Sequence, residues 1–286
     1  MKRERAVVLA RGLGTRMRQA TEGADLRDPI QMQAAETGAK AMMPIVGLLR
    51  DASGTIVSGS MSRPFLDYIL SALADAGYTD VCLVVAPDHE AMARHYSGPG
   101  APRRISLAFA VQDEPIGTAN AVAAAEAWTG DDSFLVINGD NYYAVRTLAS
   151  LVGRGDAATA LYRADALVAQ SNIPMDRIRA FALGVVEDGR LARIVEKPTP
   201  EQAAALGDRA LVSMTCWRMP PAIHAACRRV TRSVRGEFEL VDAVNAVIAD
   251  GARFEVVVAE DGVLDLSRRG DIAAVEDALL GVTVNP

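Results

Sequence analysis

Residues 7–18, which read VVLARGLGTRMR, limit the folds open to this chain more than any other stretch. The apolar run at its start predicts a short buried strand. The chain then turns through Gly12 and Gly14, because glycine permits sharp turns and a close approach of the backbone to a ligand. Free N–H groups in such a turn form a concave anion site, and Arg16 adds a planar fork of donors suited to phosphate. The stretch is therefore typical of a polyphosphate site at the end of a strand.

The loop differs from two familiar phosphate-binding loops. A dinucleotide-binding fingerprint needs a third glycine where Met17 stands, and a P-loop needs Gly-Lys-Ser/Thr, which is absent here. A pair of glycines after a strand also occurs in ordinary turns. Taken alone, the loop leaves a phosphate site and a plain turn about equally favoured.

Apolar runs alternate with helical periodicity over the first two-thirds of the chain. Runs that predict strands lie at residues 81–86, 105–111, 133–137 and 157–162. A helix with Pro64 in its first turn is expected to end at Gly77. The alternation predicts an α/β fold with a mostly parallel sheet and helices on both faces.

The later part of the chain predicts a mixed sheet with a small β-hairpin region. The runs 180–186 and 191–195 flank Glu187-Asp188-Gly189-Arg190, which is typical of a hairpin turn. Another turn is expected at Asp51-Ala52-Ser53-Gly54.

The domain organisation follows from length and from the absence of linkers or repeats. With 286 residues, of which 50% are hydrophobic, the chain has room for one large domain or two small ones. We expect one domain over residues 1–286, closed by an amphipathic helix at 270–281. Residues 19–39 are polar without a clear period and predict a long loop with a helical turn near Gln31–Glu36, which we interpret as a lid or an oligomer contact.

Charge and cysteine usage exclude several function classes. The net charge is -6, and neither a basic stripe nor a polybasic tail is present, so the sequence predicts no binding of nucleic acid or membrane. The apolar run after the basic N-terminus is too short for a signal peptide. The three cysteines and three histidines have no metal or redox spacing. These features predict buried thiols in a cytoplasmic protein.

Candidate site residues follow the predicted strands. In open α/β sheets, ligands bind at the carboxyl ends of the strands, where Gly12–Arg16, Gln112 and Asp140 are expected. From its position alone, Asp140 is either a helix N-cap or a metal ligand. Asp265 stands between apolar strand residues, where an acid is costly to bury unless it is paired or bound to a cation. Two such aspartates facing phosphates would hold Mg²⁺.

Several motifs, taken in order, carry a resemblance to a known family. They are the Gly12-Leu13-Gly14-Thr15-Arg16 loop, Lys40, Gln112 to Ala119, Asn138-Gly139-Asp140, Glu196-Lys197-Pro198, Gly236 to Leu240 and Leu264-Asp265. With this order and spacing, the chain resembles the sugar-phosphate nucleotidyltransferases over nearly its whole length. The resemblance implies a Rossmann-like nucleotidyltransferase fold. It also implies the Mg²⁺-dependent reaction of an NTP with a sugar 1-phosphate to give an NDP-sugar and pyrophosphate.

The resemblance also implies roles for individual residues. Arg16, Lys40 and Asp140 would be catalytic, and Asp140 with Asp265 would bind the metal. The nucleotide would be bound by Ala10, Gly12, Gly14, Thr15, Gln112, Gly117 and Thr118. The sugar phosphate would be bound by Gly184, Glu196, Lys197 and Glu237. A Glu237 that opens a helix could equally serve the helix dipole alone.

The resemblance further implies that Gln112 and Gly117 would contact the base. A glutamine amide offers both a donor and an acceptor, which suits uracil or thymine, so UTP or dTTP is favoured over GTP. Two positions depart from the family pattern. Arg11 replaces a small residue beside the nucleotide, where it would crowd the pocket, point away or add a phosphate contact. Ala39 replaces the proline that usually precedes the lysine.

Two other functions remain open at this stage. One is a sensor that binds a nucleotide or sugar nucleotide without turnover. The other is nucleotidyl transfer to a non-sugar phosphate, such as a phosphocholine-like acceptor. The presence of Arg16, Lys40, Asp140, Asp265 and Lys197 favours the enzyme. Family members are commonly oligomeric, so a homo-oligomer is expected by analogy.

Overall fold

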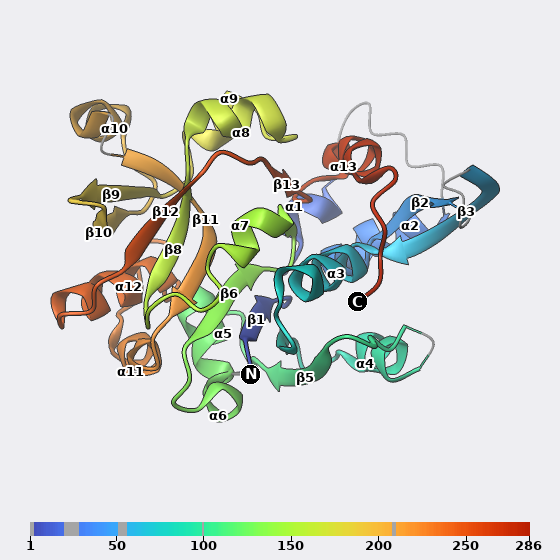
Figure 1. The fold of residues 1–286 in the computed structure, drawn as a ribbon, viewed down its shortest axis with the longest axis horizontal. Coiled ribbons are helices and arrows are strands. Elements are labelled where there is room, and N and C mark those ends of the chain that lie inside the picture. Colours follow the sequence, from blue (N-terminus) through green and yellow to red (C-terminus); the bar gives the residue numbers. More distant parts are fainter. Residues whose placement is uncertain (1–2, 20–28, 51–55, 99, 208–209) are drawn as a thin grey trace.

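A nine-stranded sheet forms the centre of the protein (Figure 1). The computed structural model describes residues 3–19, 29–50, 56–98, 100–207 and 210–286, with side-chain surroundings omitted at 47–50 and 56–61. In spatial order the strands are β5 (Ser106–Val111), β4 (Asp80–Val85), β1 (Arg5–Leu9), β6 (Phe134–Asn138), β11 (Ala210–Met219), β8 (Ala158–Tyr162), β12 (Glu255–Ala259), β10 (Arg190–Val195) and β9 (Leu183–Glu187). The α/β class with a mixed, helix-flanked sheet is confirmed.

The first four strands of this order are parallel to one another, and β8 is parallel to β12. Strand β11 runs antiparallel to β6 and β8, and it also pairs with β9. The predicted hairpin is present as β9–β10, with Asp188 and Gly189 at positive φ in its turn. It joins the edge of the main sheet, so the mixed region is one end of the same sheet.

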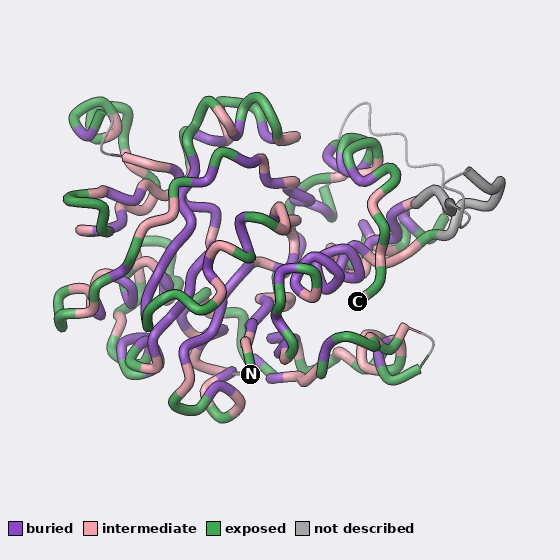
Figure 2. Tube along the Cα trace, in the orientation of Figure 1, coloured by how far each residue is buried: buried purple, intermediate pink, exposed green. Residues whose placement is uncertain are grey.

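Helices cover both faces of the sheet, as the alternating side chains of β1 illustrate. Ala6 and Val8 belong to one buried cluster, whereas Val7 belongs to the other. The first cluster includes residues of α3 (Phe65–Ala76), α7 (Val145–Ala149) and α13 (Ile272–Leu279). The second includes residues of α5 (Thr118–Ala124), α11 (Ala222–Arg229) and α12 (Leu240–Ala249). The central strands are accordingly buried along most of their length (Figure 2).

Smaller elements complete the fold. A separate hairpin, β2 (Pro44–Arg50) with β3 (Ile56–Pro64), leads into α3, and the turn predicted at 51–54 lies outside the described residues. The short strands β7 (Asn141–Tyr143) and β13 (Val263–Asp265) pair with each other. The remaining helices are α1 (Thr15–Arg18), α2 (Pro29–Thr37), η1 (Lys40–Met42), α4 (Glu90–Ser97), α6 (Glu126–Thr129), α8 (Ala164–Gln170), α9 (Met175–Ile178), α10 (Pro200–Leu206) and η3 (Arg269–Asp271). None of the described helices is long and apolar enough to cross a membrane.

The helical turn predicted near Gln31–Glu36 is present and is longer than expected, because α2 is a helix of nine residues from Pro29 to Thr37. Residues 20–28 lie outside the described part of the chain. A polar side chain anchors this helix: Gln31 is buried and donates to the Pro44 carbonyl oxygen (2.9 Å) and to Glu276 of α13 (2.7 Å). The position of α2 is therefore fixed by a tertiary contact, which the local sequence pattern does not reveal.

The three cysteines, Cys82, Cys216 and Cys227, are free and buried, as predicted. Burial raises the pKa of each thiol. The cysteines therefore act as core residues.

Candidate active site

The glycine loop and the Asn138-Gly139-Asp140 turn meet where β1 and β6 end. The Gly139 N–H donates to the Leu9 carbonyl oxygen (2.9 Å), and the Ala10 N–H donates to that of Val84 (2.9 Å). A Cβ on Gly139 would lie 2.9 Å from the Leu9 oxygen, so only glycine allows this approach. The parallel strands thus bring two of the predicted motifs into direct contact.

A second close approach joins the glycine loop to the segment that carries Lys40. Gly14 has a left-handed backbone (φ 61°), and a Cβ there would lie 2.5 Å from Gly38 Cα. Arg18 reinforces the contact by donating from Nη2 to the Thr37 carbonyl oxygen (2.9 Å). Arg16 is exposed and makes no hydrogen bond or ion pair with the described residues, so its guanidinium is free to meet an anion.

The residue before the lysine explains one departure from the family pattern. Gly38, with φ 74°, ends α2, and the Ala39 N–H donates to the Ala34 carbonyl oxygen (2.9 Å). A proline at position 39 has no N–H and could not make this bond. Alanine therefore suits a chain in which a helix leads directly into Lys40.

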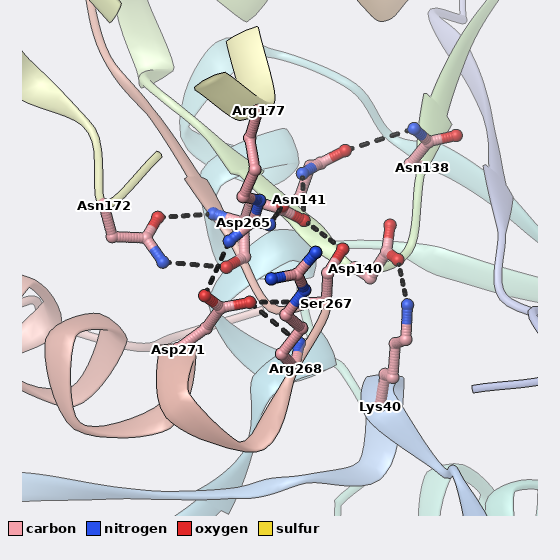
Figure 3. Close-up of polar contacts among 10 residues, drawn as sticks. All are labelled: Lys40, Asn138, Asp140, Asn141, Asn172, Arg177, Asp265, Ser267, Arg268 and Asp271. Carbon is pink, nitrogen blue, oxygen red and sulfur yellow. Dashed lines mark hydrogen bonds and ion pairs between the residues drawn. The ribbon is translucent and has the colours of Figure 1, made fainter. Parts of the chain in front are cut away.

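Lys40 and Asp140 form the central ion pair of the site. Lys40 Nζ lies 2.7 Å from Asp140 Oδ2 (Figure 3). The lysine side chain is 12% exposed and the aspartate side chain 28%. The pair is thus sheltered yet open on one side, as a group that meets a substrate phosphate must be.

Asp265 lies next to Asp140 because β7 and β13 pair antiparallel. Asp265 is opposite Asn141, and the Leu266 N–H donates to the Asp140 carbonyl oxygen (2.9 Å). Burial raises the pKa of the Asp265 carboxyl to about 6; the Asp140 charge adds to this rise, whereas Arg177 opposes it. The expected neighbourhood of the two aspartates is therefore present.

Arg177 of α9 was not predicted as a site residue. Its guanidinium pairs with Asp265 and also lies 2.7 Å from Asp271 Oδ1 (Figure 3). The sequence carries no motif around this arginine, because α9 is a single short turn without an apolar period. The contact between Arg177 and Asp265 arises from the tertiary fold and could not be predicted from the local sequence.

The donor set can be tested against Mg²⁺, which binds one or two carboxylates together with substrate phosphates. Asp140 fits this requirement, since its Oδ1 accepts no hydrogen bond from the described residues. Asp265 does not fit as placed, because Asn141, Ser267 and Arg177 already occupy its oxygens. No group of three or more His, Cys, Asp or Glu side chains in the described ranges could hold a metal alone. The arrangement suits a cation shared between Asp140 and a bound triphosphate.

Arg11 joins the glycine loop to the segment predicted to read the base. It donates from Nε to the Gln112 carbonyl oxygen (2.6 Å) and from Nη2 to that of Asp113 (2.8 Å). These two hydrogen bonds account for the direction of the Arg11 side chain, without crowding of the nucleotide pocket and without a phosphate contact. Its guanidinium fixes the backbone of the next loop.

Gln112 is buried, and its side-chain amide is held by one backbone and one side-chain oxygen. Its Nε2 donates to the Gly117 carbonyl oxygen (3.1 Å) and to Asn120 Oδ1 (2.9 Å). Both amide hydrogens are used within the protein, so Gln112 as it lies here has no free donor to offer the base. Its Oε1, which accepts no bond within the described ranges, remains to meet an N–H. The Thr118 hydroxyl, predicted to face the nucleotide, accepts the Leu240 N–H (2.9 Å).

We expect Gly117→Ala to lower the free energy of unfolding by about 3 kcal/mol or more. Gly117 has φ 131°, and a Cβ would lie 2.5 Å from the Phe238 nitrogen. Urea unfolding measures the loss. Gly153→Ala is the control, because Gly153 also has positive φ (66°) but open space around a Cβ. Equal stability of the two variants would contradict the close packing of the base loop on Phe238.

The Glu196-Lys197-Pro198 motif follows β10, beside an arginine that was not predicted as a site residue. Arg235 Nη2 lies 3.4 Å from Glu196 Oε1 and 2.6 Å from Glu239 Oε1. Burial raises the pKa of the Glu196 carboxyl, and Arg235 opposes the rise. Glu237, predicted in the sugar pocket or at a helix start, is exposed, and the helix begins only at Leu240. The buried acid of this segment is Glu239.

Two further predicted residues have distinctive backbones. Gly184 is buried in β9, paired with Ile194 and Leu211, and a Cβ there would lie 2.5 Å from a Leu161 methyl carbon. Lys197 has a positive φ of 42°, which is uncommon for a residue with a side chain. Because Leu183 pairs with Val195, Gly184 and Glu196 lie near the same end of this strand pair.

A family model described as nucleotidyl transferase matches residues 51–275. The chain belongs to this family. The glycine loop and Lys40 precede the matched range. Glucose-1-phosphate thymidylyltransferase of Streptomyces antibioticus is 30% identical over 280 residues, which are 96% of this chain and 66% of that protein. This chain thus spans just under two-thirds of that relative's length.

Two further proteins are similar to this chain in size or in fold. The UTP–glucose-1-phosphate uridylyltransferase AglF of Haloferax volcanii is 26% identical over 275 residues, with 96% of each chain covered. A solved UDP-glucose pyrophosphorylase in complex with UDP-glucose superimposes with a TM-score of 0.69 at 16% identity, covering 96% of this chain and 98% of that one. The predicted nucleotidyltransferase fold is therefore confirmed.

Proposed function

We propose that this protein transfers a nucleotidyl group from UTP or dTTP to a sugar 1-phosphate, with release of pyrophosphate. The observation that carries the proposal is the Lys40–Asp140 ion pair at the end of β6, next to Asp265 and to the glycine loop. Cationic and acidic groups that converge there suit a reaction that depends on positioning and on charge neutralisation.

In the reaction, an oxygen of the sugar phosphate attacks the α-phosphorus of the NTP, and the bond to the β-phosphate oxygen breaks. Arg16 and the N–H groups of residues 12–15 would hold the β- and γ-phosphates, so that pyrophosphate departs toward a cationic loop. Lys40 would neutralise the α-phosphate while negative charge builds up on its oxygens. The sheltered position of Lys40 strengthens this interaction, because fewer water molecules screen it.

Asp140 would hold Mg²⁺ through its open oxygen, and the cation would supply charge neutralisation for the phosphates when bound. Asp265 would lie beside Asp140 and add a second negative charge near the cation. The role of Lys40 here is to keep the Asp140 carboxylate oriented until the nucleotide enters.

Selection of the base would depend on Gln112. Its Oε1 can only accept a hydrogen bond, and uracil, thymine and guanine each present a ring N–H where cytosine and adenine present an acceptor. CTP and ATP are thus disfavoured. On the sugar side, Lys197 would pair with the phosphate, and Glu196 would accept hydrogen bonds from sugar hydroxyls.

A matrix of NTPs against phosphorylated acceptors tests the proposal. UTP, dTTP, GTP, CTP and ATP are each combined with glucose 1-phosphate, other sugar 1-phosphates and phosphocholine, and pyrophosphate release is measured. We expect turnover with UTP or dTTP and a sugar 1-phosphate. Turnover confined to phosphocholine would change the acceptor class. Nucleotide binding without any turnover would identify a sensor and contradict the proposal.

A further inference from the structure

The segment that carries Arg177 is fixed to the strand that carries Asp265. Asn172 donates from Nδ2 to the Asp265 carbonyl oxygen (2.8 Å) and accepts the Asp265 N–H at Oδ1 (2.8 Å). Ser171 Oγ accepts the Val263 N–H (2.9 Å), and Gln170 Nε2 donates to the Glu260 carbonyl oxygen (2.7 Å). Residues 170–172, at and just after the end of α8, and three residues of the segment 260–265 therefore act as one clasp, which sets where α9 begins.

The clasp places the Arg177 guanidinium between two buried carboxylates. The Arg177 side chain is 10% exposed, and those of Asp265 and Asp271 are 6% and 9% exposed. Asp271 is itself held by the N–H groups of Ser267 (2.9 Å) and Arg268 (2.8 Å). The arginine thus has two anchored partners, and Figure 3 shows it pointing from α9 into this cluster.

The two site aspartates consequently differ in what they offer a cation. Asp265 Oδ1 accepts from Ser267 Oγ (2.8 Å) and from Asn141 Nδ2 (3.2 Å), while Oδ2 accepts from Arg177. Asp140 binds Lys40 through Oδ2 alone. An incoming cation therefore finds one open oxygen on Asp140, whereas every oxygen of Asp265 already has a donor.

We propose that Arg177 is the resident counter-cation of Asp265, so that this protein holds its divalent metal through Asp140 and not through Asp265. Asp265 then serves as a positioning residue that ties β13, α9 and η3 together beside Asp140. The inference rests on the proposed function only in taking Asp140 as the metal ligand.

A metal is poorly placed to displace this arginine. A guanidinium presents a rigid fork of N–H donors and makes several directed hydrogen bonds at once. If Arg177 withdrew, Asp271 would lose its only side-chain cation among the described residues and would be left as an uncompensated buried charge. A divalent ion at Asp265 would have to offset that cost.

Binding of Mn²⁺ tests the inference without turnover. Free Mn²⁺ is measured by electron paramagnetic resonance during titration of the full chain, with UTP present and no sugar phosphate, and the Mn²⁺ bound by the same concentration of UTP without protein is subtracted. Arg177→Met frees Asp265 beside Asp140, so we expect it to bind Mn²⁺ at least about tenfold more tightly than the unmodified protein. Arg179→Met is the matched control, because Arg179 is an exposed arginine of the same segment. It is expected to leave the affinity unchanged.

Two aspartate variants complete the test. Asp265→Asn is expected to leave Mn²⁺ affinity within about twofold of the unmodified protein, whereas Asp140→Asn is expected to abolish binding. The inference is overturned if Asp265→Asn weakens binding as much as Asp140→Asn, or if Arg177→Met does not tighten it. If Arg177→Met fails to fold, the Asp265→Asn comparison decides. Unchanged binding in Asp140→Asn would instead remove the metal assignment of the proposed function as well.

Discussion

Asp140→Asn is expected to reduce kcat by about a thousandfold, which corresponds to about 4 kcal/mol of transition-state stabilisation. The substitution removes the one open carboxylate oxygen of the site and the partner of Lys40 Nζ at 2.7 Å. Steady-state assays of pyrophosphate release with the preferred NTP and sugar 1-phosphate measure the loss.

The fold should tolerate this change, because the Asp140 carbonyl oxygen still accepts the Leu266 N–H. The melting temperature is therefore expected to stay close to that of the unmodified protein. Asp188→Asn is the matched control: Asp188 is an exposed acid in the β9–β10 turn, and asparagine tolerates its positive φ of 49°. Full activity in Asp140→Asn would refute the role given to this carboxylate.

Lys40→Met is expected to lower kcat by roughly 10²- to 10³-fold with little change in the KM of the sugar 1-phosphate. Methionine fills similar space but carries no charge to set against the α-phosphate. Asp140 also loses its cation, so the two carboxylates of the site repel each other more strongly. Separate measurement of kcat and KM checks the result.

Lys197→Met provides the contrast. Lysine occurs at only three positions in this arginine-rich chain, residues 2, 40 and 197, and two of them are assigned to phosphates. Loss of Lys197 should raise the KM of the sugar phosphate, because that side chain is assigned to ground-state binding as well. If Lys40→Met changed KM alone, Lys40 would be a binding residue and not a catalytic one.

The sequence allowed prediction of those features that local patterns encode. The glycine loop, the strand before it and the helix from Phe65 to Ala76 each have a signature within a dozen residues. The order of motifs implied that Lys40, Asp140 and Asp265 share a site, and the strand pairings bring them together. Burial of the three cysteines was predicted because their spacing matches no metal or redox motif.

Other features depend on contacts between distant residues, which local patterns cannot reveal. Helix α2 is anchored by Gln31, and Arg177 acquires its partners only when α9 folds against β13. Glu239, which was not predicted as a site residue, pairs with Arg235 just before α12 begins, and the sequence pattern around Glu237 did not reveal this contact. One helix start does have a local signal that was not used in the prediction: Thr199 and Gln202 form a capping box that begins α10.

The backbone contact between Gly14 and Gly38 has a mechanical consequence. Where two backbone segments touch directly, no side chain lies between them that could change rotamer and absorb a movement. A shift of one segment is therefore transmitted almost fully to the other. The segments that carry Arg16 and Lys40 should then move together. A triphosphate that displaces the Arg16 segment on binding would also displace the Lys40 segment, so both sides of the phosphate site would move in one concerted step.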